Sequence, residues 1–267
     1  MRILFLGTGA ADWENPGKHV NGGRRFTSQL LDESILLDCG PMTWEAIEEF
    51  GVDINKLTDV VIGHPHSDHF NVDTISKIAM KRNSSLPPLR LHVNKKATER
   101  VLLTPEMAAH LEVFGFEPGD IFECNGYKFE AVLSNHLLEI KGELATFLCI
   151  TTPADEHLFY ALDGSWLPKE AWWKLRKLET PFDYIIWDMT CGTLDDWRLF
   201  EHCNLNMIAT MTRVFKNYNV AKKDAVVFAS HVMKEACGDM ERLRADVKAA
   251  GIVLAEDGLI YDSRTAK

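Results

Sequence analysis

The sequence predicts one α/β domain in which two β-sheets are flanked by helices. Short apolar runs alternate with helical stretches along the whole chain. No linker rich in serine or proline and no shift in composition divides residues 1–267. Hydrophobic residues make up 46% of the 267 residues, which is enough for a substantial core in a single large domain. Two sheets covered by helices fit this inventory best.

The expected strands are short runs rich in β-branched and aromatic residues, and turn-forming residues bound them. The first half of the chain is strand-hairpin in character, with mostly tight turns between the runs. The runs are residues 2–6, 27–31, 34–38, 59–62, 89–93, 120–123, 127–133, 144–151, 157–162, 184–187, 225–229, 252–254 and 259–261.

The expected helices follow apolar residues at helical spacing, and the longer ones fall in the second half of the chain. They cover residues 42–50, 72–80, 95–114, 169–178, 195–218 and 234–250.

The segment His64-Pro65-His66-Ser67-Asp68-His69 follows the expected strand 59–62 and precedes the expected helix 72–80. Three imidazoles and a carboxylate within six residues are typical of a metal site. Alternate residues of an extended turn point the same way, so His64 and His66 can share one ion. Asp68 and His69 lie further round the turn and suit a neighbouring ion. The alternative is a polar loop with a helix-capping residue, but capping needs only one such side chain.

Three further ligand candidates each follow an expected strand: His136, Asp163 and His231. Strand ends along one edge of a sheet form a crevice where ligands gather. Taken alone, a histidine or aspartate after a strand is usually a turn residue or a cap. Together with the histidine segment they complete two coordination shells.

Charge, cysteine usage and hydropathy exclude several classes of protein. The net charge of −10 argues against a dedicated binder of long nucleic acid, although bound metal ions would still allow a small anionic substrate. Six scattered cysteines without a C-x-x-C pair suit free thiols in a reducing compartment. No apolar run approaches the ~20 residues of a membrane helix, and Met1 opens directly into a strand. A soluble, cytoplasmic protein is therefore expected.

Several motifs resemble those of metallo-β-lactamase-fold hydrolases, and within them the PhnP-like cyclic phosphodiesterases, neighbours of the tRNase Z enzymes. The likeness spans nearly the whole chain. It rests on the histidine segment and on Leu6-Gly7-Thr8-Gly9, Leu36-Leu37-Asp38-Cys39-Gly40, His136, Asp163-Gly164-Ser165 and Ser230-His231.

The resemblance implies a four-layer αββα sandwich with a dinuclear metal site between its sheets. It also assigns the ligands: His64, His66 and His136 for one ion, Asp68, His69 and His231 for the other, and Asp163 as the bridge. Imidazole and carboxylate ligands suit Zn²⁺ or Mn²⁺. Asp38 would support a ligand histidine from behind; the alternative is an ordinary turn aspartate before Gly40.

His202 lies where these phosphodiesterases carry a histidine near the start of a helix, although Glu201 stands in place of the usual glycine. The resemblance implies a general acid or a phosphate clamp, and the alternative is a surface or capping histidine.

The implied reaction is hydrolysis of a small cyclic or linear phosphodiester by a metal-bridging hydroxide, which Asp68 would orient while it ligates. A thioester or lactone hydrolase and a non-catalytic metal-binding protein are the alternatives. The natural substrate, the choice between Zn²⁺ and Mn²⁺ and the oligomeric state, including a homodimer, stay open.

The segment 10–25 lacks the cysteine-rich zinc loop of close PhnP relatives, so their particular phosphonate-pathway substrate is not implied here. Trp13, His19, Arg24 and Arg25 make this segment either a substrate-facing lid or a solvated loop.

Overall fold

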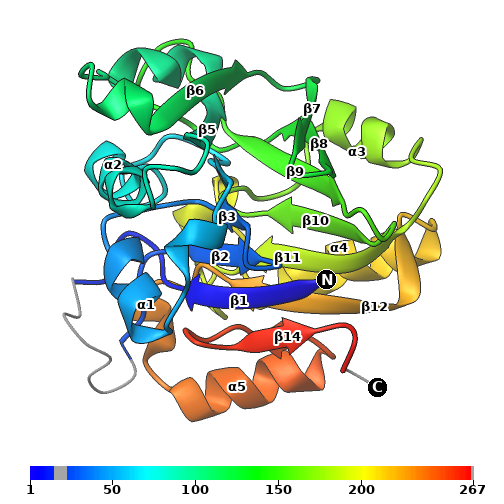
Figure 1. The fold of residues 1–267 in the computed structure, drawn as a ribbon. Helices are drawn as coiled ribbons and strands as arrows, with labels where there is room; N and C mark the ends of the chain where they lie inside the picture. The colour runs from blue at the N-terminus through cyan, green and yellow to red at the C-terminus, as the bar shows by residue number, and fades with distance from the viewer. Residues whose placement is uncertain (15–22, 266–267) are drawn as a thin grey trace.

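The computed structural model describes residues 1–14 and 23–265 of the chain. Two sheets face each other, and helices cover their outer faces (Figure 1). This is the expected four-layer αββα arrangement, and the prediction of two mixed sheets flanked by helices is confirmed.

The first sheet has the strand order β14-β1-β2-β3-β4-β5-β6. Its members from β14 to β3 pair antiparallel, whereas β3 to β6 pair parallel. The bounds are β1 Arg2–Gly7, β2 Ser28–Leu31, β3 Ile35–Leu37, β4 Asp59–Val61, β5 Leu89–Asn94, β6 Leu111–Phe116 and β14 Ile260–Asp262.

The second sheet has the strand order β13-β12-β11-β10-β9-β8-β7. Strands β7 to β10 pair antiparallel and β10 to β13 pair parallel. The bounds are β7 Ile121–Cys124, β8 Tyr127–Leu133, β9 Thr146–Thr151, β10 His157–Ala161, β11 Phe182–Asp188, β12 Ala221–Ser230 and β13 Val253–Leu254.

The α-helices bury one apolar face each against the outside of a sheet. Helices α1 (Thr43–Glu49) and α2 (Val72–Lys81) pack on the first sheet, and α3 (Lys169–Leu175), α4 (Leu205–Asn217) and α5 (Met240–Ala249) pack on the second. Short 3₁₀ turns complete the inventory: η1 Ile54–Lys56, η2 Lys95–Arg100, η3 Met107–Ala109, η4 Trp197–Phe200 and η5 Glu235–Cys237. A separate apolar layer fills the space between the two sheets.

The expected helix over residues 95–114 is wrong. The segment forms η2, η3 and then strand β6, which pairs in parallel with β5 along its whole length. Pro105 interrupts the helical pattern, and the sequence Leu-Glu-Val-Phe-Gly-Phe suits the edge of a sheet. Pairing with β5 outweighs the local helical spacing.

The expected helices 195–218 and 234–250 are shorter than predicted, and each follows a 3₁₀ turn. Asn204 and Asp239 cap α4 and α5 by accepting hydrogen bonds from the backbone N–H groups of Met207 and Arg242. Capping by these short polar side chains sets where the regular helix begins.

Within the described residues, we find no helix with the length and hydropathy needed to cross a bilayer.

Candidate metal centre

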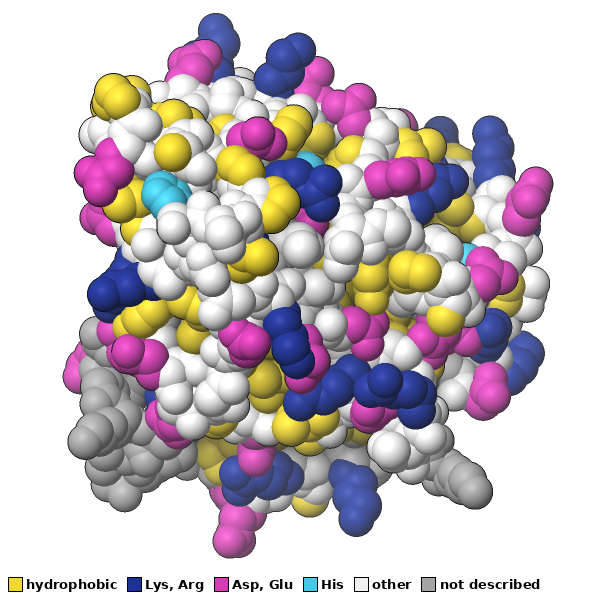
Figure 2. All heavy atoms as spheres, viewed as in Figure 1, with side chains coloured by type: hydrophobic (Ala, Val, Ile, Leu, Met, Phe, Trp, Pro, Cys, Tyr) yellow, Lys and Arg dark blue, Asp and Glu magenta, His cyan; other side chains and the backbone are white. Residues whose placement is uncertain are grey.

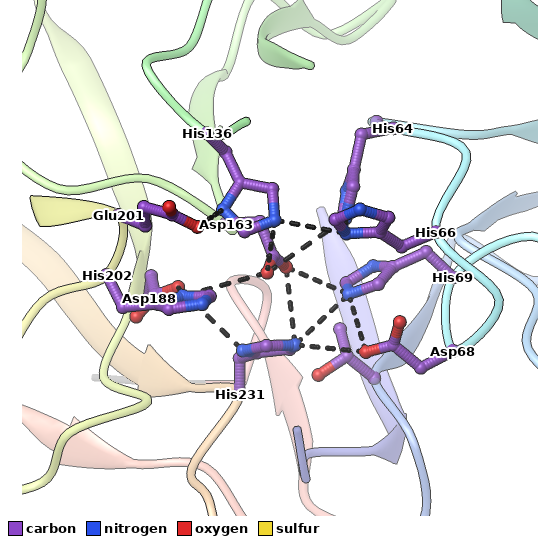
Figure 3. Close-up of polar contacts among 12 residues, drawn as sticks. His64, His66, Asp68, His69, His136, Asp163, Asp188, Glu201, His202 and His231 are labelled. Atoms are coloured by element: carbon purple, nitrogen blue, oxygen red, sulfur yellow. Dashed lines mark hydrogen bonds and ion pairs between the residues drawn. The ribbon is translucent and has the colours of Figure 1, made fainter. Parts of the chain in front are cut away.

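The loops that leave four strands bring all seven predicted ligands together (Figure 3). The histidine segment follows β4, His136 follows β8, Asp163 follows β10 and His231 follows β12. These strands belong to both sheets, so both sheets contribute ligands to the group.

The histidine loop is fixed to its neighbours by main-chain contacts. The N–H of Cys39 donates to the carbonyl oxygen of His69 (2.7 Å), and the N–H of Phe70 donates to that of His66 (2.8 Å). An added Cβ at Gly40 would lie 2.0 Å from the carbonyl oxygen of Asp68, so only glycine permits this close approach. The main chain thereby sets the direction of the ligand side chains.

One set of imidazole nitrogens belongs to His64, His66 and His136. Nδ1 of His66 lies 3.1 Å from Nε2 of His64 and 3.0 Å from Nε2 of His136. Oδ1 of Asp163 lies 4.0 Å from the same nitrogen of His64 and 3.8 Å from that of His136. These atoms surround one point, as ligands of a single ion would.

A second set belongs to Asp68, His69 and His231. Nε2 of His69 lies 3.1 Å from Nε2 of His231 and 3.3 Å from Oδ2 of Asp68. Oδ2 of Asp163 lies 2.8 Å from Nε2 of His69 and 3.2 Å from that of His231. Asp163 therefore directs one carboxylate oxygen toward each set, the position expected of a bridge.

The electrostatics of the group favour a cation among these side chains. Burial disfavours a charged Asp163, but His231, His69 and His64 outweigh it and hold the pKa of that carboxyl well below its usual value. Burial lowers the pKa of His64. Burial also opposes charge on His69, yet Asp163, Asp68 and Asp38 raise its pKa well above normal. The anionic carboxylates thus favour positive charge at this point.

Two local features favour bound metal ions over a network of hydrogen bonds alone. Oδ2 of Asp163 is buried and, among the described residues, no donor forms a well-aligned hydrogen bond to it. Asp38, Asp163 and His231 adopt left-handed backbone conformations, with φ of 57°, 50° and 60°. Such conformations are strained for residues other than glycine and cluster at functional sites. The residues present therefore fit a pair of divalent ions.

Asp38 supports His69 from behind, as the resemblance implies. Its Oδ2 lies 2.9 Å from Nδ1 of His69 and 2.6 Å from the hydroxyl of Tyr160, while its Oδ1 accepts from the N–H of Gly63 (2.8 Å). The Tyr160 hydroxyl also lies 2.7 Å from Oε1 of Gln29. This buried chain of hydrogen bonds fixes the ring orientation that presents Nε2 to the site.

Two other ligand histidines also have an outer partner, meaning a group that contacts the ring nitrogen directed away from the proposed ion. Nε2 of His66 lies 3.2 Å from Glu139, and Nδ1 of His231 lies 2.7 Å from the hydroxyl of Thr190. Nδ1 of His136 is buried and has no hydrogen-bond partner within the described part of the chain; Oε2 of Glu201 lies 3.9 Å from it.

His202 lies beside the two ligand sets and contacts a carboxylate of its own. Its Nδ1 is 2.9 Å from Oδ2 of Asp188, the last residue of β11, and 3.7 Å from Oδ1 of Asp163. Burial opposes charge on the ring, but Asp188 outweighs it and raises the pKa of His202 to about 9. The ring is therefore a cation at neutral pH, in contrast to His64 and His136, whose pKa values burial lowers.

A cavity of about 340 Å³ opens onto this group. Its walls include His202, His66, Asp68 and the exposed ring of Trp197, and its rim carries acidic and basic groups. We use "rim" for the exposed or half-buried charged residues that line the cavity: Asp12, Arg198, Glu201 and Glu235.

Segment 10–25 divides between described and undescribed residues. The indole N–H of Trp13 donates to the carbonyl oxygen of Val232 (2.7 Å). Arg24 is buried and donates to Thr8, and the buried Arg25 forms an ion pair with Glu49. These contacts place both arginines in the fold and not on a lid. His19 lies outside the described residues.

Sequence reasoning missed Asp188, Thr190, Tyr160 and Glu139. Asp188 follows the expected strand 184–187 directly, so the rule that found Asp163 and His231 would also have found it. Tyr160 lies inside a strand and Glu139 within a loop, where no spacing marks them.

Comparison with known proteins agrees with this fold. Solved structures of similar fold include the metallo-β-lactamase-fold protein YhfI from Bacillus subtilis (TM-score 0.73, 13% identity, 97% of this chain and 98% of that one). A diphosphatase of the PhnP family has a TM-score of 0.71 at 21% identity, covering 98% and 97%. The short form of human tRNase Z has a TM-score of 0.68 at 18% identity, covering 98% and 99%. The predicted metallo-β-lactamase fold is confirmed.

Two archaeal sequences are also similar over half of the chain. Ribonuclease Z of Methanosarcina mazei is 29% identical over 146 residues, which are 51% of this chain and 45% of that protein. Ribonuclease Z of Methanosarcina acetivorans is 26% identical over 149 residues, with the same coverage. The match thus spans about half the length of these relatives. A family model matches far more of the chain, residues 1–220, and the chain accordingly belongs to the Anti-Pycsar protein Apyc1 family.

Proposed function

We propose that this chain is a metal-dependent hydrolase of a small cyclic or linear phosphodiester and that it uses two divalent ions, Zn²⁺ or Mn²⁺. The observation that carries the proposal is the position of His202. A cationic imidazole, held by Asp188, lies on the cavity wall next to a complete two-metal ligand group. PhnP-family diphosphatase and tRNase Z structures share the fold, which is consistent with the proposal.

The roles divide among the chain's own residues. His64, His66 and His136 would hold one ion, Asp68, His69 and His231 the other, and Asp163 both. When bound, the ions supply a water-derived nucleophile at neutral pH and neutralise charge on the phosphoryl group. Asp68 would orient the attacking water, and His202 would donate its proton to the departing alkoxide oxygen.

The cavity and its charges favour a small substrate over a long nucleic acid. A volume of about 340 Å³ suits a small molecule. Three of the four charged rim residues are acidic, and Arg198 forms ion pairs with Asp196 and Glu235. On the face shown in Figure 2, acidic and basic side chains are interspersed and form no basic band. Long nucleic acids bind to basic surfaces.

The same ligand group would also permit thioester or lactone hydrolysis. A thiolate leaves readily without protonation because thiols have pKa values near 8.5, so a thioesterase gains little from a cationic His202. A non-catalytic metal-binding protein would have no need for His202 beside a complete ligand set.

Six free cysteines suit a reducing compartment, and we extend the proposal to a cytoplasmic protein.

The test is a substrate screen on metal-free protein reloaded with Zn²⁺ or Mn²⁺. We expect hydrolysis of bis-p-nitrophenyl phosphate and of cyclic or linear alkyl phosphodiesters, with thioesters and lactones unchanged. Asp163→Ala should abolish the activity, and His110→Ala, outside the cavity walls, should retain it. Turnover of thioesters or lactones without turnover of phosphodiesters would contradict the proposal.

A further inference from the structure

A second group of potential metal ligands lies outside the candidate catalytic group, at the opposite end of strand β4. It consists of Asp59, His92 and Cys124, whose ligand atoms all lie within 4.8 Å of one another. Asp59 begins β4, whereas the catalytic histidine segment follows the other end of that strand. All three side chains are at least nine-tenths buried, with exposed fractions of 0%, 6% and 0%.

The three residues come from both sheets. Asp59 and His92 lie on the neighbouring strands β4 and β5 of the first sheet, and Cys124 ends β7, an edge strand of the second. A metal ion bound by all three would therefore link the two sheets.

The side chains are already oriented toward one another. Nε2 of His92 lies 2.9 Å from Oδ1 of Asp59, within the 2.8–3.3 Å range that His69 shows with its three neighbours in the catalytic group. The His92 ring is stacked between Phe114 and Phe122, with centroid distances of 5.2 and 5.3 Å and interplanar angles of 17° and 13°. The ring is thus held in one orientation before any ion binds.

Arg90 provides the outer support that metal-ligating carboxylates usually have. Its guanidinium donates to Oδ2 of Asp59 (2.7 Å), which leaves Oδ1 directed at His92. A carboxylate and a thiolate would balance the two positive charges of a divalent ion.

We propose that Asp59, His92 and Cys124 form a structural site for a thiophilic divalent ion, Zn²⁺ above all, that fastens the two sheets together. One carboxylate, one imidazole and one thiolate are zinc ligands, whereas Mg²⁺ and Mn²⁺ prefer oxygen. On binding, the ion would displace the proton between His92 and Asp59 and the proton of the Cys124 thiol, and both protons would pass to solvent. The ion would act as a clamp distinct from the catalytic pair.

Cobalt substitution distinguishes this site from the catalytic one, because only a thiolate ligand gives an intense sulfur-to-cobalt absorption in the near ultraviolet. The seven catalytic ligands are histidines and aspartates. Metal-free protein titrated with Co²⁺ should develop this absorption and should bind one equivalent more than its catalytic complement. Cys124→Ser and His92→Asn should each lose that equivalent and the absorption.

The matched controls keep this test independent of the proposed function. Cys149→Ser, a buried cysteine of β9 in the same sheet as Cys124, should retain the absorption. Asp163→Ala should retain it too, while losing catalytic metal. Absence of the absorption in folded wild-type protein saturated with Co²⁺ would overturn the proposal and show a network held by protons alone. Persistence of the absorption in Cys124→Ser would overturn it as well.

Discussion

Oδ2 of Asp188 lies 2.9 Å from Nδ1 of His202, and the two residues come from different elements: the end of β11 and the turn before α4. Oδ1 of Asp188 accepts from the N–H groups of Thr190 (2.8 Å) and Cys203 (3.1 Å), so the carboxylate is fixed from two sides. The contact orients the ring and keeps it charged. Asp188 is therefore a positioning residue for His202.

Replacing Asp188 by Asn should lower kcat by about 10- to 100-fold, the usual effect of removing an outer partner. The amide keeps the shape of the side chain but no longer stabilises the imidazolium. A double-mutant cycle with His202→Ala checks the assignment, because Asp188→Asn should have little further effect once the ring is gone. Full additivity of the two losses would show that Asp188 acts elsewhere, for example through His231, whose Nδ1 lies 3.7 Å away.

His202→Ala should leave metal content unchanged and lower kcat by about 10²–10⁴, the range that general acid catalysis contributes. The loss should be smaller for bis-p-nitrophenyl phosphate than for an alkyl diester, because p-nitrophenolate departs without protonation. Steady-state kinetics on both substrates provide the check. Equal losses would assign His202 to phosphate binding, and no loss would make it a structural histidine.

Asp163→Ala should remove activity and at least one metal equivalent. Without the bridging carboxylate, two cations would face each other across a short gap with no shared anion. Elemental analysis of protein purified without chelator measures the loss. A variant with full metal content and turnover would exclude a bridging role for Asp163.

Tyr160→Phe should weaken metal binding at the set formed by Asp68, His69 and His231, because it removes one of three hydrogen bonds that hold Asp38. We expect an affinity loss of up to about tenfold, at the lower end for outer partners. Tyr184→Phe is the matched control, since its buried hydroxyl also contacts a carboxylate, Glu156, away from the site. Competition with a metal chelator measures both affinities, and equal values for the two variants would remove Tyr160 from the site.

The seven candidate ligands that the structure brings together are each marked locally in the sequence. Four lie within six residues of one another, and His136, Asp163 and His231 follow apolar strands that are recognisable by composition. Asp38 is marked by its position after a short strand. Their convergence follows from strand ends that share one edge of the fold.

The outer partners Thr190, Tyr160 and Glu139 were beyond sequence reasoning because their contacts with the site depend on tertiary structure. Tyr160 reads as an ordinary strand residue, and its hydroxyl meets Asp38 only when the two sheets face each other. Strand β6 was mistaken for helix for a similar reason, since its pairing with β5 is a tertiary contact. The distal group of Asp59, His92 and Cys124 also spans two sheets, and no local spacing connects its members.

The central claim is that seven side chains at this edge of the fold hold two metal ions. Anomalous diffraction at the zinc and manganese edges, from crystals of protein loaded with either ion, tests it most directly. We predict two peaks in the cavity, one among His64, His66 and His136 and one among Asp68, His69 and His231, with Asp163 in contact with both. A single peak at full loading, or two of these side chains directed away from the peaks, would contradict the account.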